Sequence, residues 1–402
     1  MGQTVISAPV VQTGQYYPYD PVKNPLGQKT WTQYFATSYS NNASYYGYNF
    51  STQLTGRIQY LGGYYVFTDY YAIYYSADGK VWNTQLVPMG TGNQIYGLAY
   101  NGTTWVIAGA NGALSTASSL GGAWTARTSA MSGAGVIRDL RWLSNANLFA
   151  WCGYTPNAGT CLIATSPDGI TWTNRYNQVS SEQYFNIGID DTTGTYVASN
   201  SNNSASNTLY STNGTSWTLT DANGGGQGGY AQFIKGAFNK WVSSAGGTLF
   251  TSSSANVGSA WYSQTPNILF HTPFNSMSYG TNTGVITPTY GNPRYSEFYY
   301  DSVNNYYYQL AMPTYNTSTL GYFYVQPPVL ITYNAATLLT TSYNTATNYY
   351  QAFPMIKEEN LPQGITGAQP QNYNFNYGYV NGVHIYTVSN QVDRTRQIWT
   401  TA

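Results

Sequence analysis

Short runs of alternating apolar and polar residues, separated by tight polar turns, make up most of this chain. In residues 58–67, 98–107, 187–197 and 233–242, two β-branched or aromatic runs flank a short turn rich in Gly, Asn or Asp. Such turns between runs of this kind indicate β-hairpins. Because no segment carries a sustained apolar period of 3.6 residues with helix caps, we expect very little helix. The pattern predicts an all-β protein.

A second hairpin in each period contains a tryptophan, and these tryptophans are regularly spaced. Trp82, Trp124, Trp172, Trp217 and Trp261 follow one another at intervals of 42, 48, 45 and 44 residues, as the differences between their numbers show. A nearly constant period in this range, with one tryptophan per repeat, is typical of a β-propeller in which each period forms a four-stranded blade.

We predict a propeller of seven blades, with eight and six blades as the alternatives. The first five blades end at the five tryptophans, a sixth spans about 295–345, and a seventh begins near residue 377. A hairpin pattern within residues 267–294 is either an insertion or part of an eighth blade.

The two ends of the chain are expected to share the last blade. The C-terminal repeat stops one strand short, and residues 28–35, around Trp31, resemble the fourth strand of the other blades. This N-terminal strand should complete the C-terminal blade and close the ring, which removes the open sheet edges that two chain ends would leave. The propeller domain then occupies residues 28–402, and residues 1–27, with four prolines, form an extended arm.

Three of the tryptophan hairpins share a motif in which Ser, Asp or Asn, Gly and Trp recur at fixed spacing. The positions are Ser76, Asp78, Gly79 and Trp82; Ser166, Asp168, Gly169 and Trp172; and Ser211, Asn213, Gly214 and Trp217. Ser and Asx side chains can bond the backbone of a tight turn, Gly supplies a positive φ, and a buried Trp fills the space between blades.

This motif resembles the Asp-box, or bacterial neuraminidase repeat, of sialidase-type β-propellers. The resemblance implies that these residues hold the turn between the third and fourth strands of a blade, with the tryptophan packed beneath it. The family usually has one residue between Asp and Gly, which are adjacent here. Because the resemblance assigns these residues to the turn and to the packing beneath it, we expect the motif to be structural and to make no contact with a ligand.

The resemblance does not bring sialidase chemistry with it. The Phe-Arg-Ile-Pro segment that carries the family's first substrate arginine is absent, and only four glutamates are present. Nothing in the spacing of the acidic residues selects a pair of carboxylates for glycoside hydrolysis. We therefore expect a protein that is not an enzyme and that needs no metal and no cofactor.

The two cysteines leave two interpretations open. Cys152 and Cys161 bracket a short loop and could face each other across neighbouring strands as a disulfide. The alternative is two small buried side chains, because the chain is not rich in cysteine.

The composition narrows the classes of partner. Only 7% of the residues are charged, against roughly 25% in an ordinary soluble domain, and 14 basic side chains balance 14 acidic ones. No long-range field would attract nucleic acid, and no apolar run approaches the ~20 residues of a membrane helix. The N-terminus lacks the basic and apolar regions of a signal peptide, so synthesis in the cytoplasm is expected.

The connections between hairpins and between blades should lie on one face of the ring, which we call the loop face. The short turns within the hairpins should lie on the other, the hairpin-turn face. The connections vary and are rich in Tyr and Asn, which is typical of adaptable binding loops, although both residues are abundant throughout the chain. The candidate ligand residues on the loop face are Tyr70, Tyr71, Tyr154, Asn202, Asn203, Tyr315 and Arg394.

Three functions compete on these grounds. The composition resembles that of bacteriophage adhesion proteins, which favours a non-enzymatic structural or adhesion protein of a virion, in a tail fibre, tail tip or surface appendage. Such a protein would dock on other virion proteins through its N-terminal arm, form a multi-copy assembly, and bind a host-surface glycan or its neighbours. The alternatives are a secreted carbohydrate-binding lectin and a sialidase-like glycoside hydrolase.

Overall fold

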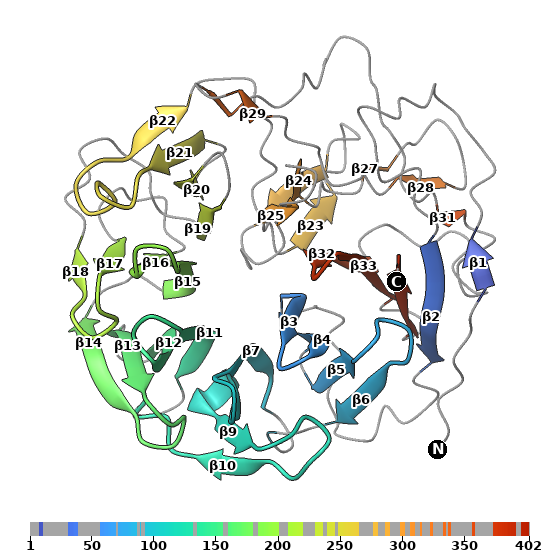
Figure 1. The fold of residues 1–402 in the computed structure, drawn as a ribbon, viewed down its shortest axis with the longest axis horizontal. Coiled ribbons are helices and arrows are strands. Elements are labelled where there is room, and N and C mark those ends of the chain that lie inside the picture. Colours follow the sequence, from blue (N-terminus) through green and yellow to red (C-terminus); the bar gives the residue numbers. More distant parts are fainter. Residues whose placement is uncertain are drawn as a thin grey trace.

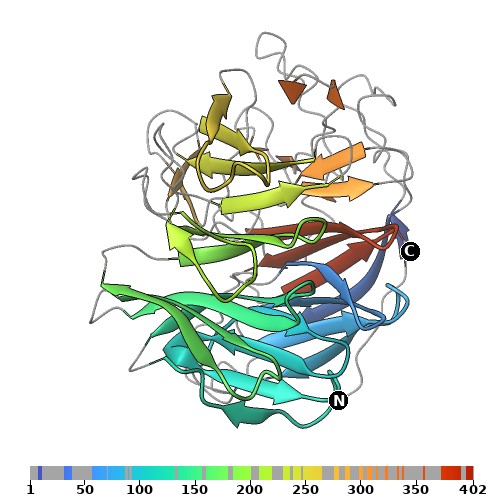
Figure 2. The same cartoon turned by 60° about the vertical axis from the view of Figure 1, so that its left-hand side comes forward.

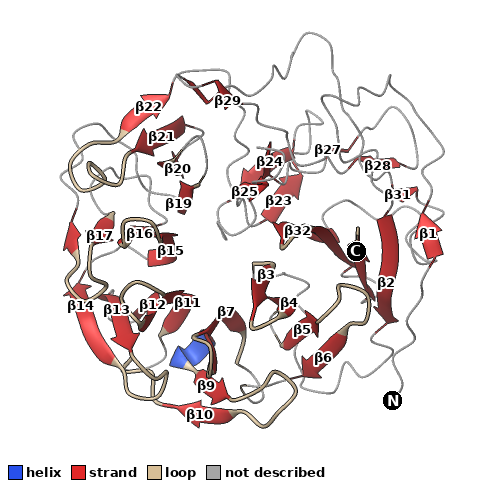
Figure 3. Ribbon diagram, viewed as in Figure 1, coloured by secondary structure: helices blue, strands red, loops and turns tan. Residues whose placement is uncertain are grey.

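The computed structural model describes most of residues 57–264, residues 373–390 and 395–401, strands at 8–10 and 31–38, and short strand segments between residues 276 and 357. The described elements are β-strands, apart from one 3-10 turn, η3, at Ala110–Gly112 (Figure 3). The expected all-β fold is therefore confirmed.

Five consecutive segments each form a four-stranded antiparallel sheet in which strands adjacent in sequence are paired. The first two sheets are β3 (Gln59–Leu61), β4 (Tyr64–Thr68), β5 (Ala72–Ser76) and β6 (Asn83–Leu86), then β7 (Ile95–Tyr100), β8 (Trp105–Gly109), β9 (Leu114–Ala117) and β10 (Thr125–Arg127). The next two are β11 (Val136–Leu143), β12 (Leu148–Thr155), β13 (Thr160–Ser166) and β14 (Thr173–Val179), then β15 (Tyr184–Asp190), β16 (Thr195–Asn200), β17 (Leu209–Ser211) and β18 (Thr218–Leu219). The fifth is β19 (Tyr230–Ile234), β20 (Lys240–Ala245), β21 (Thr248–Ser252) and β22 (Tyr262–Gln264).

The sheets are arranged around a common axis as the blades of a β-propeller. Figure 1 shows the first strand of each sheet nearest the axis and the last strand at the rim. Figure 2 shows from another side how neighbouring sheets lie against one another.

A sixth sheet contains both ends of the chain. It is ordered β1-β2-β34-β33-β32, with β1 at Ala8–Val10, β2 at Trp31–Ser38, β32 at Tyr373–Val380, β33 at Val383–Asn390 and β34 at Thr395–Thr400. Strand β2 pairs with β34 as predicted, although it runs to Ser38 rather than ending at residue 35. Residues 28–30 lie outside the described residues. Of the predicted arm, residues 8–10 add a further strand to β2.

The contacts between neighbouring blades repeat at the junction between the last and first blades. A Cβ added at Gly97 would lie 2.6 Å from Leu140 Cβ in the next blade, and one at Gly378 would lie 2.6 Å from Ile58 Cβ. The Thr400 hydroxyl also donates a hydrogen bond of 3.0 Å to the carbonyl of Gly79 in the first blade. The last and first blades therefore pack against each other in the same way as other pairs of neighbouring blades.

The hydrophobic core is divided into clusters that lie between adjacent blades. In strand β8, Trp105 and Ile107 pack in a cluster shared with the first blade, whereas Val106 packs in a cluster shared with the third. Successive side chains of a strand point to opposite faces, so each sheet buries both of its faces against its neighbours. This explains why strand β8 is apolar and buried at every position.

Residues 276–357 contain shorter strands. They are β23 (Ser276–Tyr279), β24 (Ile286–Thr289), β25 (Phe298–Asp301), β26 (Tyr306–Gln309), β27 (Thr314–Tyr315), β28 (Tyr322–Tyr324), β29 (Tyr333–Asn334), β30 (Thr337–Leu338) and β31 (Ile356–Lys357). The hairpin expected within residues 267–294 is present as β23 and β24. The total of seven blades stays a prediction.

The two cysteines lie on neighbouring strands but are not cross-strand partners. Cys152 of β12 is opposite Ile163, and Cys161 of β13 is opposite Tyr154, so the two are offset by two positions. The register therefore does not place the two cysteines directly opposite each other, as the disulfide interpretation had them. Cys152 is buried in the cluster between the third and fourth blades.

Candidate functional site

The three complete motifs form the same hydrogen-bonded turn. In the first, the Ser76 hydroxyl accepts from the Gly79 amide at 2.9 Å, and Asp78 Oδ1 accepts from the amides of Lys80 and Val81 at 2.8 Å each. Trp82 donates its indole N–H to the Gly79 carbonyl at 3.1 Å, and Gly79 has a φ of 74°. The same bonds recur from Ser166 to Trp172 and from Ser211 to Trp217.

Hydrogen bonds within each turn lower the pKa of the aspartate carboxyl that belongs to the turn. The Val81 amide is the largest influence on the Asp78 carboxyl, and together with the Lys80 amide and the Ser76 hydroxyl it lowers the pKa of that carboxyl below its ordinary value. Burial alone would raise the pKa of Asp168, but hydrogen bonds from Thr171, Ile170 and Ser166 outweigh it and lower that pKa. These carboxylates are ionised groups that complete a turn.

The second blade shows the consequence of an incomplete motif. It keeps only Ser118, the glycines and Trp124. The indole N–H of Trp124 is buried and has no hydrogen-bond partner among the described residues. In the fifth blade, Trp261 instead donates to the Val257 carbonyl at 3.0 Å.

The structure describes the side chains of two of the seven candidate ligand residues. Tyr71 is buried beside Tyr96, so little of its ring is available to a ligand, contrary to expectation. Tyr154, at the end of β12, is half-buried. Tyr315 lies in β27, whose side chains are not described, and Tyr70, Asn202, Asn203 and Arg394 lie outside the described residues.

An arginine that the sequence did not single out lies between two tyrosine rings on the loop face. The Arg138 guanidinium carbon is 5.1 Å from the ring centre of Tyr96 and 5.3 Å from that of Tyr154, and Nη2 donates to the Tyr154 hydroxyl at 2.9 Å. Both distances are within the range of cation–π attraction. We call Tyr96, Arg138 and Tyr154 the loop-face cluster, in which Tyr96 is buried beside Tyr71 and the half-buried Arg138 and Tyr154 are partly accessible.

Irregularities in the innermost strands position this cluster. The ladder between β11 and β12 shifts register between Ile137 and Asp139, which leaves Arg138 as the extra residue of a β-bulge. The ladder between β7 and β8 shifts between Ile95 and Gly97, which leaves Tyr96 as the extra residue there. A bulge re-aims the side chain that it carries. Two neighbouring blades therefore both turn a bulged side chain into the cluster.

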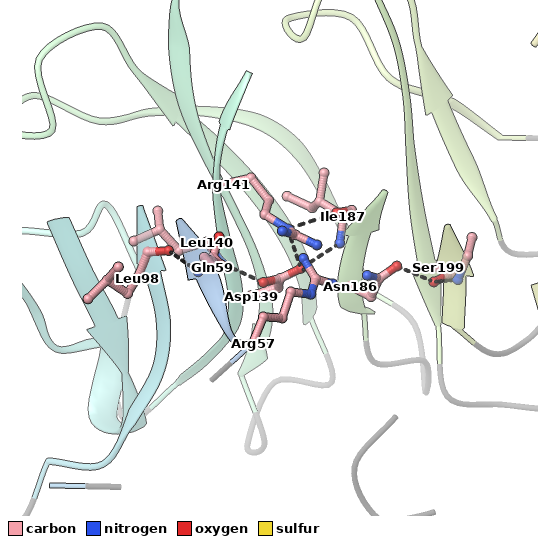
Figure 4. Close-up of polar contacts among 10 residues, drawn as sticks. Arg57, Gln59, Leu98, Asp139, Leu140, Arg141, Asn186, Ile187 and Ser199 are labelled. Atoms are coloured by element: carbon pink, nitrogen blue, oxygen red, sulfur yellow. Dashed lines mark hydrogen bonds and ion pairs between the residues drawn. The ribbon is translucent and has the colours of Figure 1, made fainter. Parts of the chain in front are cut away.

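Next to the cluster, a buried polar network joins blades around the axis of the ring (Figure 4). Asp139 Oδ2 is 3.4 Å from Arg57 Nη2 and 3.4 Å from Arg141 Nε, and it accepts from the Ile187 amide at 2.9 Å. Arg57 comes from the start of the first blade, Asp139 and Arg141 from the third, and Ile187 from the fourth. We call these groups, with Asn186, the central network.

Asn186 extends the central network to the fifth blade. The amide orientation that satisfies both of its ends places the oxygen 2.6 Å from Arg57 Nη2 and the nitrogen 2.7 Å from the Ala231 carbonyl. A pocket of about 10 Å³ lies beside the network, lined by Arg57, Thr68 and Tyr96 among others. This is near the minimum volume that holds one water molecule, so this pocket has no room for a substrate.

The six acidic side chains that the structure describes all have structural contacts. Asp78 and Asp168 complete turns, Asp139 belongs to the central network, and Asp69 accepts from the amides of Tyr71 and Ala72. The remaining two follow one another: Asp190 accepts from Thr193 and Ser254, and Asp191 pairs with Lys235 at 2.7 Å.

The described residues contain no group of three His, Cys, Asp or Glu that could hold a metal. Among the described segments, no helix has the length and hydropathy of a membrane span.

The chain resembles solved structures of other proteins. No family model matches the chain, and no curated protein sequence matches it. A structure of YCF48 bound to a D1 peptide is 11% identical, with a TM-score of 0.48, over 90% of this chain and 94% of that one. YCF48 from Cyanidioschyzon merolae is also 11% identical, with a TM-score of 0.42, over 84% of this chain and 90% of that one.

Proposed function

We propose that this β-propeller is a non-enzymatic recognition protein of a bacteriophage virion, in a tail fibre, tail tip or surface appendage. Its propeller contacts a host-surface glycan or neighbouring virion proteins through the loop face, and its N-terminal arm contacts other virion proteins. The single observation that carries the recognition role is the loop-face cluster, in which Arg138 lies between Tyr96 and Tyr154.

The chemistry of the cluster favours binding. Arg and Tyr are the residue types enriched where a few side chains supply most of the energy of an interface. The rings and the guanidinium hold one another in place, so little conformational entropy is lost when a partner binds. The described carboxylates, by contrast, are used in turns and ion pairs, which supports a binding role over hydrolysis.

The virion assignment is supported by composition. Only 7% of residues are charged, and 43 tyrosines accompany many Asn, Ser, Thr and Gly residues. A surface of this kind suits permanent contact with other proteins or with sugars. Mass spectrometry of purified phage particles is the direct test. Absence of the chain from particles of the phage whose genome encodes it would contradict the assignment.

The loop face is tested with a matched pair of arginine variants. Arg138→Gln removes the cation from the cluster. Arg175→Gln removes an arginine of the outer strand β14, which donates to the Thr165 hydroxyl of β13 at 2.8 Å. The fluorescently labelled protein is titrated onto host cells or onto the purified virion proteins. We expect Arg138→Gln to weaken binding at least tenfold and Arg175→Gln to leave it unchanged, with equal thermal midpoints. Equal binding by both variants would reject the loop face.

A separate assay tests the non-enzymatic role. The purified chain is incubated with fluorogenic sialosides and other glycosides, and no turnover is expected. Turnover that disappears in a single arginine variant would replace the proposal with hydrolysis.

A further inference from the structure

The buried ring of Tyr71 packs against the loop-face cluster from the first blade. Tyr71 and Tyr96 form one hydrophobic cluster, 9% and 7% exposed, with Ala110 and Val136 packed against them. The ring of Tyr96 in turn lies under the Arg138 guanidinium, 5.1 Å from its carbon. Tyr96 is therefore the link between a residue of the first blade and the arginine of the third.

The position of Tyr96 depends on packing, because the β-ladder does not hold it. It is the extra residue where the ladder between β7 and β8 shifts register, and the extra residue of a bulge is left unpaired. Cation–π attraction needs the cation over the face of the ring, so the contact with Arg138 depends on how the Tyr96 ring is oriented. Two described side chains contact this residue beside the arginine: Gln94 accepts from its hydroxyl, and Tyr71 packs on it.

The loop between β4 and β5, which carries Tyr71, is held by Asp69. This aspartate is 3% exposed. Its Oδ1 accepts from the amides of Tyr71 and Ala72 at 2.8 and 2.7 Å, and its Oδ2 accepts from the Tyr74 hydroxyl at 3.1 Å. A buried carboxylate is stable only when donors of this kind satisfy it. The three bonds fix the backbone at Tyr71 and hence the point from which its ring extends.

The far end of this support lies in the core of the first blade. Tyr74 is fully buried, and its ring stacks on that of Phe67 with centres 4.9 Å apart and planes 8° from parallel. Contacts therefore run without interruption from this stacked pair, through Asp69 and Tyr71, to Tyr96.

We propose that Tyr71, anchored by Asp69, is a positioning residue of the loop-face cluster. It holds the ring of Tyr96 against the Arg138 guanidinium, and so keeps the arginine in place for a partner that Tyr71 itself does not touch. The inference rests on the proposed recognition role of this cluster, but the orientation of Arg138 can be measured without any partner.

Two pairs of variants separate this support from other effects of substitution. Tyr71→Ala removes the ring that packs on Tyr96, whereas Tyr71→Phe keeps it. Asp69→Ala removes the acceptor of all three hydrogen bonds. Asp69→Asn keeps one oxygen for the two backbone amides, and its NH₂ group can donate to the Tyr74 hydroxyl oxygen. The Phe and Asn variants are therefore the matched controls.

The first measurement is the accessibility of Arg138 in the full chain. Each protein is treated with phenylglyoxal, which reacts with accessible guanidinium groups, and the reaction of each arginine is followed by peptide mass spectrometry. We expect Arg138 to react at least threefold faster in Tyr71→Ala and Asp69→Ala than in the unsubstituted chain, and at nearly the unsubstituted rate in the two controls. The exposed Arg175 and the buried Arg57 should keep their rates in every variant, which shows that the fold is intact.

The second measurement is the binding of the same labelled variants to host cells, with Arg138→Gln for comparison. We expect Tyr71→Ala to weaken binding at least threefold and Tyr71→Phe to retain it. An unchanged Arg138 rate in Tyr71→Ala, or an increase that Arg57 shares, would overturn the positioning role. Weaker binding by Arg138→Gln with full binding by Tyr71→Ala would overturn it as well. Faster reaction of Arg138 alone, with binding unchanged in Arg138→Gln, would instead reject the recognition role of the cluster and leave the positioning role of Tyr71 standing.

Discussion

At the scale of single residues, the motif turns depend on an acceptor oxygen more than on a charge. Asp78, Asp168 and Asn213 occupy equivalent positions and accept the same two backbone amides at 2.8 to 2.9 Å. Asn213 does this without an ionised group. The carboxylates add a dependence on pH, because their pKa values are lowered in the folded chain.

Two substitutions of Asp168 separate the oxygen from the charge. Asp168→Asn keeps the acceptor and should change the free energy of unfolding at pH 7 by less than about 0.5 kcal/mol, whereas Asp168→Ala loses both bonds and should cost about 1 kcal/mol. The lowered pKa stabilises the folded state above the unfolded value near 3.8 and this stabilisation is lost as the pH falls through the folded value. Urea unfolding at neutral and acidic pH should show a smaller acid loss for Asp168→Asn. An acid loss equal to that of the unmodified chain would contradict this account.

The sequence predicts contacts within a turn far better than contacts between strands. The motif residues are close in sequence, and local chemistry fixes their bonds. The place of Arg138 depends on a bulge between Ile137 and Asp139, and nothing in the residue types marks a bulge. Tyr71 was expected to be exposed because it lies in a loop, but Asp69 bonds the loop backbone and the Tyr71 ring packs on Tyr96.

At the scale of elements, the motif glycines fix how closely blades approach. A Cβ added at Gly169 would lie 2.6 Å from Val106 Cγ2 of the preceding blade. Gly214 meets Leu143 of its preceding blade in the same way, at 3.0 Å. The same glycine thus serves two purposes: its positive φ shapes the turn, and its missing side chain lets the neighbouring sheet approach.

Gly169 and Gly63 allow these two purposes to be separated. Both have a positive φ, 77° and 83°, but a Cβ at Gly63 would meet nothing within 4 Å. Gly63→Ala should therefore cost only the strain of the left-handed conformation, roughly 1–2 kcal/mol. Gly169→Ala should cost about 1–3 kcal/mol more, because it overpacks the space between blades. Equal losses by urea unfolding would show that the contact with Val106 is irrelevant.

At the scale of the whole molecule, two kinds of contact join blades that are distant in sequence. The central network connects Arg57 of the first blade to Asp139 of the third, across 82 positions of sequence as the difference of their numbers shows. Removing one partner of a buried ion pair usually costs about 3–5 kcal/mol, because the other charge stays buried. The sequence offers no sign of this pairing. Ring closure, by contrast, could be predicted, because Trp31 repeats the local pattern of a fourth strand.

The closing strand can be tested with two deletions. Removal of residues 1–30 keeps β2, whereas removal of residues 1–38 deletes it along with the six residue pairs that it forms with β34. At about 1 kcal/mol for each net hydrogen bond, the longer deletion should cost several kcal/mol and expose the edge of β34 to other chains. We expect a lower thermal midpoint and self-association in size-exclusion chromatography for this variant alone, and partial rescue by a peptide of residues 31–38.

Because Thr400 also bonds the Gly79 carbonyl and Gly378 packs on Ile58, the deletion should loosen the last blade without unfolding the first. Hydrogen exchange should accordingly increase in residues 373–400 and stay slow in β4 and β5, and equal protection of both regions would show that β2 does not hold the ring closed.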